Sequence, residues 1–96
     1  MPSFVILGRF SQEGATKIKD SPERLAAARK VVKSVGGEIK EFYYTMGRYD
    51  FVAITEGPSS EAVLQALFTI GSVGAVRTET LAAVPAEKAA EIIKKS

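Results

Sequence analysis

The sequence predicts a single α+β domain in which two helices cover one face of a four-stranded antiparallel sheet. Three observations support this. The length of 96 residues suits one domain. Strand-like and helix-like segments follow one another in the order β-α-β-β-α-β. Short turn signals separate them. Short right-handed connections turn this order into the split βαβ, or ferredoxin-like, arrangement, with the first and third strands at the centre.

The first half of the chain contains a strand and an amphipathic helix. Residues 3–10 form a continuous apolar run rich in β-branched and aromatic side chains, which is typical of a central strand. Residues 11–19 are polar and predict a loop with room for one helical turn. A helix should then begin at residues 20–23, with Ser21 capping its first free N–H groups and Pro22 in its first turn. Its apolar stripe comprises Leu25, Ala28, Val32 and Val35, and Gly36-Gly37 ends it.

The second half adds a hairpin, a second helix and a last strand. Residues 38–45 and 49–56 predict paired strands joined by a turn at 46–48. The second helix should begin at residues 57–61 and end at Gly71 and Gly74. Its apolar face comprises Val63, Leu67 and Ile70, with Leu64 and Phe68 beside them. Residues 75–84 complete the sheet. We therefore expect a domain over residues 1–84, followed by a C-terminal helical tail over residues 85–96.

Composition excludes several kinds of chemistry. The chain has no cysteine and no histidine, so thiol catalysis, disulfides, Cys/His zinc sites and histidine relays are excluded. We expect no cofactor, although a magnesium or calcium site built from carboxylates alone stays open. The 13 basic and 11 acidic residues nearly balance, which gives no indication of a nucleic-acid partner. No apolar stretch is long enough to span a membrane and no signal peptide is visible, so the expected location is the cytoplasm.

Both faces of the central strands are apolar, and this predicts self-association. In the first strand Phe4, Ile6 and Phe10 point one way and Val5 and Leu7 the other. The third strand does the same, with Phe51 and Ala53 opposite Val52 and Ile54. Two helices can cover only one face, so the second would be a large exposed apolar patch in a lone chain. The expected solution is a homodimer or higher homo-oligomer in which sheet packs against sheet. The alternative is that the C-terminal helix folds back over this face.

Charged residues in the sheet are the first candidates for ligand binding. Arg77 and Glu79 are two residues apart on the last strand, so they share a face with Leu81. They could form the polar floor of a ligand pocket, with Arg77 binding a carboxylate or phosphate. They could equally form an ion pair within or across an oligomer interface, because neither charge would be buried unpaired. Arg9 on the first strand is a further candidate of the same kind.

The hairpin turn holds the second group of candidates. Gly47 suits a turn that needs freedom from Cβ strain. Asp50 could act as a general base, but a role in capping the turn, by accepting hydrogen bonds from its backbone N–H groups, fits it better. Tyr44 and Tyr49 offer rings with a hydroxyl group, which could line a pocket or complete the edge of the core. Arg48, between Gly47 and Tyr49, completes this set of candidate ligand-binding residues.

The hairpin motif resembles that of the GYD-domain family, named for a Gly-Tyr-Asp motif. The match is Gly47-Arg48-Tyr49-Asp50, with one residue between the glycine and the tyrosine. Other segments resemble the family pattern as well: Gly14, Ile18-Lys19-Asp20-Ser21-Pro22, Arg24, Gly36-Gly37 and Val76-Arg77-Thr78-Glu79-Thr80. The resemblance extends to about Val84 and does not include the tail. It implies a dimeric α/β barrel of ferredoxin-like domains, but no activity.

Three functions remain open from the sequence. The first is a homo-oligomeric module that binds or senses a small organic or anionic ligand in a barrel between subunits, using Arg9, Tyr44, Arg77 and Glu79. The alternative is a cofactor-independent enzyme, similar to monooxygenases or isomerases, in which Tyr49 or Asp50 moves a proton and Arg77 stabilises an oxyanion. The third, RNA binding, is disfavoured because the third strand lacks the usual aromatic pattern and a basic rim.

Overall fold

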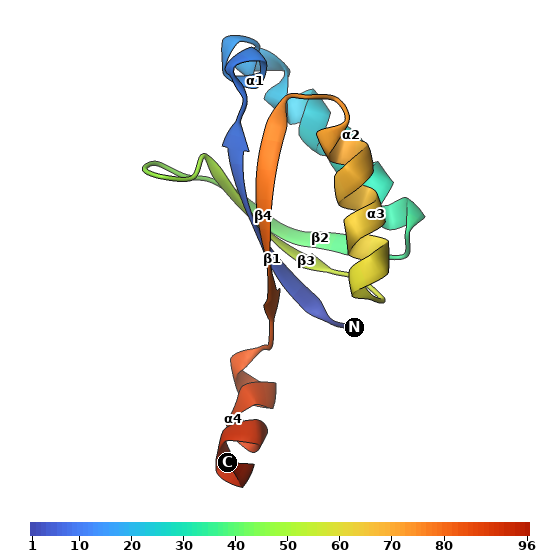
Figure 1. Cartoon of the computed structure of the whole chain (residues 1–96), viewed down its shortest axis with the longest axis vertical. Helices are drawn as coiled ribbons and strands as arrows, with labels where there is room; N and C mark the ends of the chain where they lie inside the picture. Colours follow the sequence, from blue (N-terminus) through green and yellow to red (C-terminus); the bar gives the residue numbers. More distant parts are fainter.

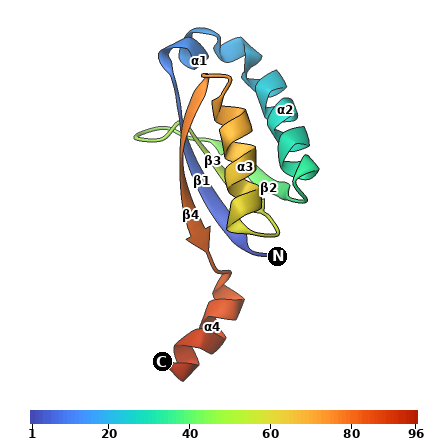
Figure 2. The same ribbon diagram turned by 45° about the vertical axis from the view of Figure 1, so that its right-hand side comes forward.

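The computed structural model describes all residues from 1 to 96 and contains one antiparallel sheet with the strand order β2-β3-β1-β4. Its strands are β1 (Ser3–Phe10), β2 (Glu38–Tyr44), β3 (Phe51–Glu56) and β4 (Val76–Ala83). Helices α2 (Ser21–Ser34) and α3 (Ser60–Gly71) lie together on one side of the sheet, as Figures 1 and 2 show. The predicted element order and the two central strands are confirmed.

The connection from β1 to α2 is more regular than the sequence predicted. It contains the short helix α1 (Gln12–Thr16) and a 3₁₀ turn (Ile18–Asp20) that leads directly into α2. Helix α2 already includes Ser21, so its N-cap residue is Asp20, whose side chain makes no capping hydrogen bond. The prediction that Ser21 caps the helix is therefore wrong. Its hydroxyl lies 2.9 Å from that of Tyr44 instead.

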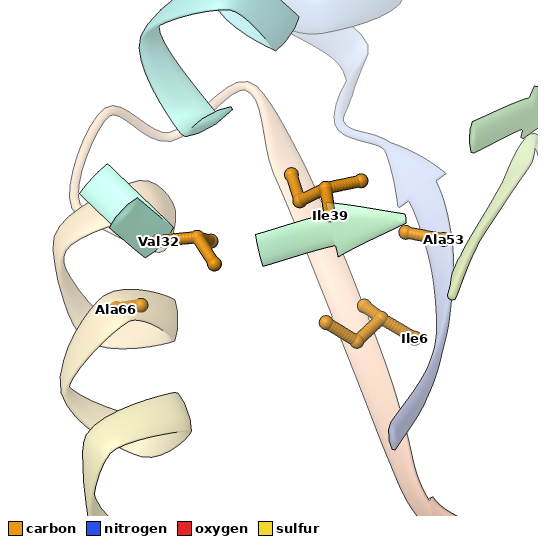
Figure 3. Packing of buried hydrophobic residues seen from close by; sticks show 5 residues of the cluster. All are labelled: Ile6, Val32, Ile39, Ala53 and Ala66. Carbon is orange, nitrogen blue, oxygen red and sulfur yellow. The ribbon is translucent and has the colours of Figure 1, made fainter. Parts of the chain in front are cut away.

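The core lies between the helix layer and the sheet. Figure 3 shows Val32 of α2 and Ala66 of α3 facing three buried side chains of the sheet, Ile6, Ile39 and Ala53. The predicted stripe of α2 is confirmed, because Leu25, Ala28 and Val35 are half-buried against this cluster. Gly36 ends α2 with a φ of 87°, a backbone conformation that only glycine adopts without strain.

Helix α3 presents part of its predicted apolar face to solvent. Ser59 caps the helix by accepting a hydrogen bond from the Ala62 N–H. Val63 and Ala66 are buried, but Leu64 is 50% exposed and Phe68 is 70% exposed. The apolar residues of this helix span more than one stripe, so the small Ala66 takes the inner position and the larger Phe68 the outer one.

The C-terminal helix α4 (Ala86–Lys95) stands apart from the rest of the molecule. Figures 1 and 2 show it continuing from the end of β4, beyond the sheet. It contributes to a longest dimension of 49 Å for a chain whose other dimensions are 30 and 16 Å. Within one chain it does not fold back over the second face of the sheet, so that alternative is wrong. None of the helices is long and apolar enough to cross a membrane.

Candidate functional site on the open face of the sheet

The face of the sheet opposite the helices has an apolar centre. The strand register places Val5 between Ile54 and Leu81, and places Leu7 between Val52 and Glu79. We call Val5, Leu7, Val52, Ile54 and Leu81 the open-face patch. The first four are only half-buried, and Leu81 is 46% exposed. The two-faced pattern read from the sequence is thus present in the folded sheet, and a single chain leaves this patch uncovered.

Charged and aromatic side chains gather at one end of this patch. The Arg9 guanidinium lies 5.0 Å from the centre of the Tyr49 ring, and its Nε donates a 3.0 Å hydrogen bond to the Arg48 carbonyl oxygen. The Tyr49 hydroxyl donates to Glu79 Oε1 at 3.1 Å. Register places Arg77 directly opposite Arg9. We call Arg9, Tyr49, Arg77 and Glu79 the polar corner.

The polar corner carries more positive than negative charge. The only ion pairs within the chain are Lys17–Glu13 and Lys40–Glu38, so Arg77 and Glu79 do not pair with each other. Glu79 accepts the Tyr49 hydroxyl, and the Arg77 guanidinium has no carboxylate partner in the chain. Two guanidinium groups beside one carboxylate favour an anionic ligand. An ion pair across an oligomer interface stays a prediction.

Two of the candidate residues lie on the helix side instead. The Asp50 carboxylate accepts a 2.9 Å hydrogen bond from the Phe10 N–H, while its own N–H donates to the Gly8 carbonyl oxygen at 2.8 Å. Asp50 therefore accepts a backbone hydrogen bond, as its sequence position favoured, but from strand β1 rather than from the turn. Tyr44 and Asp50 line a hollow of about 410 Å³ near Ser21. The structure thus separates both residues from Arg77.

The Gly-x-Tyr-Asp motif builds the hairpin that supports the polar corner. Gly47 has a φ of 104°, a backbone conformation that only glycine adopts without strain, so the motif requires a glycine at this position. Thr45 closes the base of the loop by donating from its N–H to the Asp50 carbonyl oxygen and from its hydroxyl to the Tyr49 carbonyl oxygen. In consequence β3 begins at Phe51, two residues later than predicted. The Arg48 backbone contacts Arg9, and Arg48 is otherwise exposed.

The sequence reasoning missed a pair on the open face of β2. The Tyr43 hydroxyl donates a 2.7 Å hydrogen bond to Glu41 Oε1. This hydrogen bond and the negative charge of Glu41 raise the pKa of the Tyr43 phenol above its ordinary value of 10.0. The available signal was their spacing, because residues two apart on a strand share one face.

We expect this pair to be visible in a tyrosine titration. Folding stabilises the neutral phenol, so this contribution to stability is present below pH 10 and is lost as the pH rises through the raised pKa. The substitution Glu41→Gln should move the Tyr43 transition to lower pH, measured by ultraviolet difference absorbance. In Tyr43→Phe the same transition should be missing. An unchanged titration curve in Glu41→Gln would contradict the assignment.

The element order and the strand order β2-β3-β1-β4 define a small ferredoxin-like α+β domain. The chain belongs to the GYD domain family, whose model matches residues 4–93. The match therefore includes most of α4, beyond the point at which the sequence resemblance ended.

One relative has a name that describes its partners. It is a Thermus thermophilus protein named glutamine synthetase and cystathionine beta-lyase binding protein. It is 31% identical over 86 residues, which cover 88% of this chain and 90% of the relative.

Solved structures share the fold. A crystal structure from Thermus thermophilus is 26% identical with a TM-score of 0.56, and the match covers 88% of this chain and 94% of that one. A feast or famine regulatory protein from M. tuberculosis, complexed with L-methionine, has a TM-score of 0.67 at 19% identity. That match covers 88% of this chain and 50% of the regulator, so the chain spans about half of the regulator's length.

Proposed function

We propose that this chain is a homo-oligomeric module that binds or senses a small organic anion between two sheets, at the polar corner. The observation that carries the proposal is the open-face patch, with two guanidinium groups at its end and only one carboxylate. A second copy packed on the patch would remove its apolar side chains from water. It would also bring a second polar corner to the same interface, because a two-fold interface repeats every residue.

The chemistry of the polar corner selects the ligand class. A guanidinium binds a carboxylate through two parallel hydrogen bonds, and such charge-assisted bonds strengthen when water is excluded. The apolar patch suits the remainder of an amphipathic ligand. Amino acids and short carboxylic acids are therefore the first ligands to test, and L-methionine is among them because it accompanies the regulator of similar fold.

The test is isothermal titration calorimetry with a panel of amino acids and short carboxylic acids. We expect Arg77→Gln to weaken binding of the ligand that the panel identifies by roughly ten- to one-hundred-fold, because it removes a charge-assisted hydrogen bond. Lys30→Gln is the matched control, since it removes one positive charge from an exposed position of α2. Equal affinities in the two variants would refute the role of Arg77.

The geometry reduces the number of residues that could serve the enzymatic alternative. The Asp50 carboxylate is occupied by the Phe10 N–H and lines the hollow near Ser21, whose lining does not include Arg77, so the geometry does not support a joint action of Asp50 and Arg77. Of the two proton-transfer candidates, only Tyr49 belongs to the polar corner.

A second candidate function, binding of a metabolic enzyme, is favoured by the outer face of α3. Leu64 and Phe68 are four residues apart and form one exposed apolar row, which a protein partner could bury. The relative named for binding glutamine synthetase and cystathionine beta-lyase gives the partner class. Aromatic side chains are common anchors in such interfaces.

This candidate is tested with the two purified enzymes. We expect Phe68→Ser to weaken binding of the immobilised chain to its enzyme by at least ten-fold in biolayer interferometry, because the anchor is lost. Gln65→Ala, at an exposed position of the same helix, should bind as the unmodified chain does. If neither enzyme binds at micromolar concentration, this candidate is excluded.

A further inference from the structure

The two edges of the sheet differ in how they are protected from pairing with a further strand. An edge strand presents a row of free N–H and C=O groups, and proteins commonly protect it with a bulge, proline, lysine or a covering element. On edge strand β2 the register shifts between Ile39 and Glu41, and Glu38 and Lys40 add further charges. Edge strand β4 pairs with β1 without any shift and contains neither proline nor lysine. Strand β4 is therefore the edge that can accept another strand.

No helix covers β4. Residues 77–82 are all exposed, although Thr78 and Thr80 share the helix side of the sheet with the buried residues of β1 that the register places beside them. The charged residues of the strand, Arg77 and Glu79, share the open face and do not block the edge itself. Another strand could thus reach β4 along nearly its whole length.

The hydrogen bonds to β1 show which backbone groups of β4 remain free. The Ser11 N–H donates to the Ala75 carbonyl oxygen at 2.9 Å. Because alternate residues of an antiparallel strand bond to the same neighbour, the odd-numbered residues of β4 direct their backbone groups at β1. The even-numbered residues Thr78, Thr80 and Ala82 therefore direct their N–H and C=O groups outward.

A second copy of β4 fits this edge. Two copies related by a two-fold axis pair antiparallel, and the residue on the axis faces its own copy. An axis at Glu79 or at Thr80 pairs nearly the whole strand. At Glu79, two carboxylates would stand directly opposite each other, which is destabilising. At Thr80, Glu79 faces Leu81 of the second copy. Arg77 then faces Ala83, so no like charges stand directly opposite and Arg77 keeps its place in the polar corner.

We propose that two copies of the chain pair their β4 strands antiparallel about a two-fold axis at Thr80, which joins two four-stranded sheets into one continuous sheet. Thr80 exchanges hydrogen bonds with its own copy, and Thr78 exchanges them with Ala82 of the second copy. This contact uses the edge of the sheet and leaves the open-face patch free, so it goes beyond the proposed function. It buries less apolar surface than a contact through that patch, so it is the weaker of the two.

The same register brings α4 to the second copy. Pro85 faces Ala75 of the second copy, and Figures 1 and 2 show α4 continuing beyond the sheet from this end of β4. Helix α4 therefore begins beside the turn that follows α3 of the second copy. Val73 in that turn is 68% exposed, and Ile93 of α4 is 69% exposed. Pairing of the edges gives both apolar side chains a neighbour that a lone chain does not supply.

Hydrogen exchange of the unmodified chain tests the pairing without any variant. At millimolar concentration, the amides of Thr78, Thr80 and Ala82 should exchange roughly ten-fold or more slowly than after dilution to micromolar concentration, because pairing occupies their N–H groups. The amides of Glu79 and Leu81 are the internal control, since they bond to β1 in either state and should change far less. Equal exchange of the three even-numbered amides across the dilution series overturns the proposal.

Single cysteines locate the axis, because the chain has no cysteine of its own. Oxidation of Thr80→Cys should give a disulfide-linked dimer, since directly opposite Cα atoms lie about 5.5 Å apart, within reach of a disulfide. Thr78→Cys is the matched control, because its two copies would lie four residues apart along the strand, roughly 14 Å. Cross-linking of Thr78→Cys at an equal or higher yield, or no cross-linking of Thr80→Cys, overturns the proposal.

A charge on the open face separates this contact from the sheet-on-sheet contact. Val5→Lys places an ammonium group in the open-face patch and leaves the edge of β4 unchanged. Added to Thr80→Cys, it should leave the disulfide-linked dimer in place at high protein concentration. Loss of the cross-link in this double variant would show that the copies meet only through the open face, and would overturn the edge contact without affecting the proposed function.

Discussion

Replacing Gly8 with alanine is expected to lower the free energy of unfolding by about 3 kcal/mol, a large share of the roughly 5–15 kcal/mol that keeps a domain folded. Gly8 is buried in the central strand β1, and a Cβ built on it would overlap the Phe51 ring. That ring is held on both sides. It stacks on Phe42 with 5.1 Å between ring centres and contacts Phe10 at 5.8 Å. It therefore cannot move aside without disturbing two other aromatic side chains.

Urea denaturation followed by circular dichroism measures this effect. Gly71→Ala is the matched control, because a Cβ at Gly71 meets no atom within 4 Å, and its stability should change by less than about 1 kcal/mol. The double variant Gly8→Ala/Phe51→Leu should be more stable than the sum of the single changes predicts, since the smaller leucine leaves room for the new methyl group. Additive losses would show that Gly8 is required for some other reason.

The second large effect is expected on self-association. Val5 lies at the centre of the open-face patch, between Ile54 and Leu81, so Val5→Lys would place an ammonium group inside the proposed interface. Burying an unpaired charge costs several kcal/mol. The concentration needed for association should therefore rise by about one-hundred-fold or more.

Sedimentation velocity over a dilution series provides the measurement. Ala26→Lys introduces the same charge at an exposed position of α2 and should leave association unchanged. A chain that sediments as a monomer at every concentration, with or without the Val5 substitution, would remove the basis for a ligand site between two sheets.

Much of the fold and part of the site could be predicted because strands alternate their side chains. Alternation alone places Arg77 and Glu79 on one face of β4, and the antiparallel order brings Arg9 beside Arg77. The same rule could not place the hairpin residues. Alternation continued back from β3 would place Tyr49 on the same face as Phe51. The loop from Thr45 to Asp50 interrupts the alternation, and the Tyr49 hydroxyl reaches Glu79 on the open face instead.

The orientation of α3 depends on how well side chains of different size fit into the core. The apolar residues of α3 extend around more than one stripe, so the sequence could not decide that Ala66 lies inside and Phe68 outside. Nothing in the strand pattern indicates that the Thr55 hydroxyl is buried without a hydrogen-bond partner.

Because α4 packs against no other part of the chain, its helical structure depends on contacts from outside the chain. It has ten residues, and a helix this short is only marginally stable in water without packing. Its Ala86, Ala89, Ala90 and Ile93 side chains share one stripe, and Ile93 is 69% exposed. If another copy of the chain packs against that stripe, the helix content at this end of the chain should increase with protein concentration. Far-ultraviolet ellipticity on dilution would then report assembly without any added label.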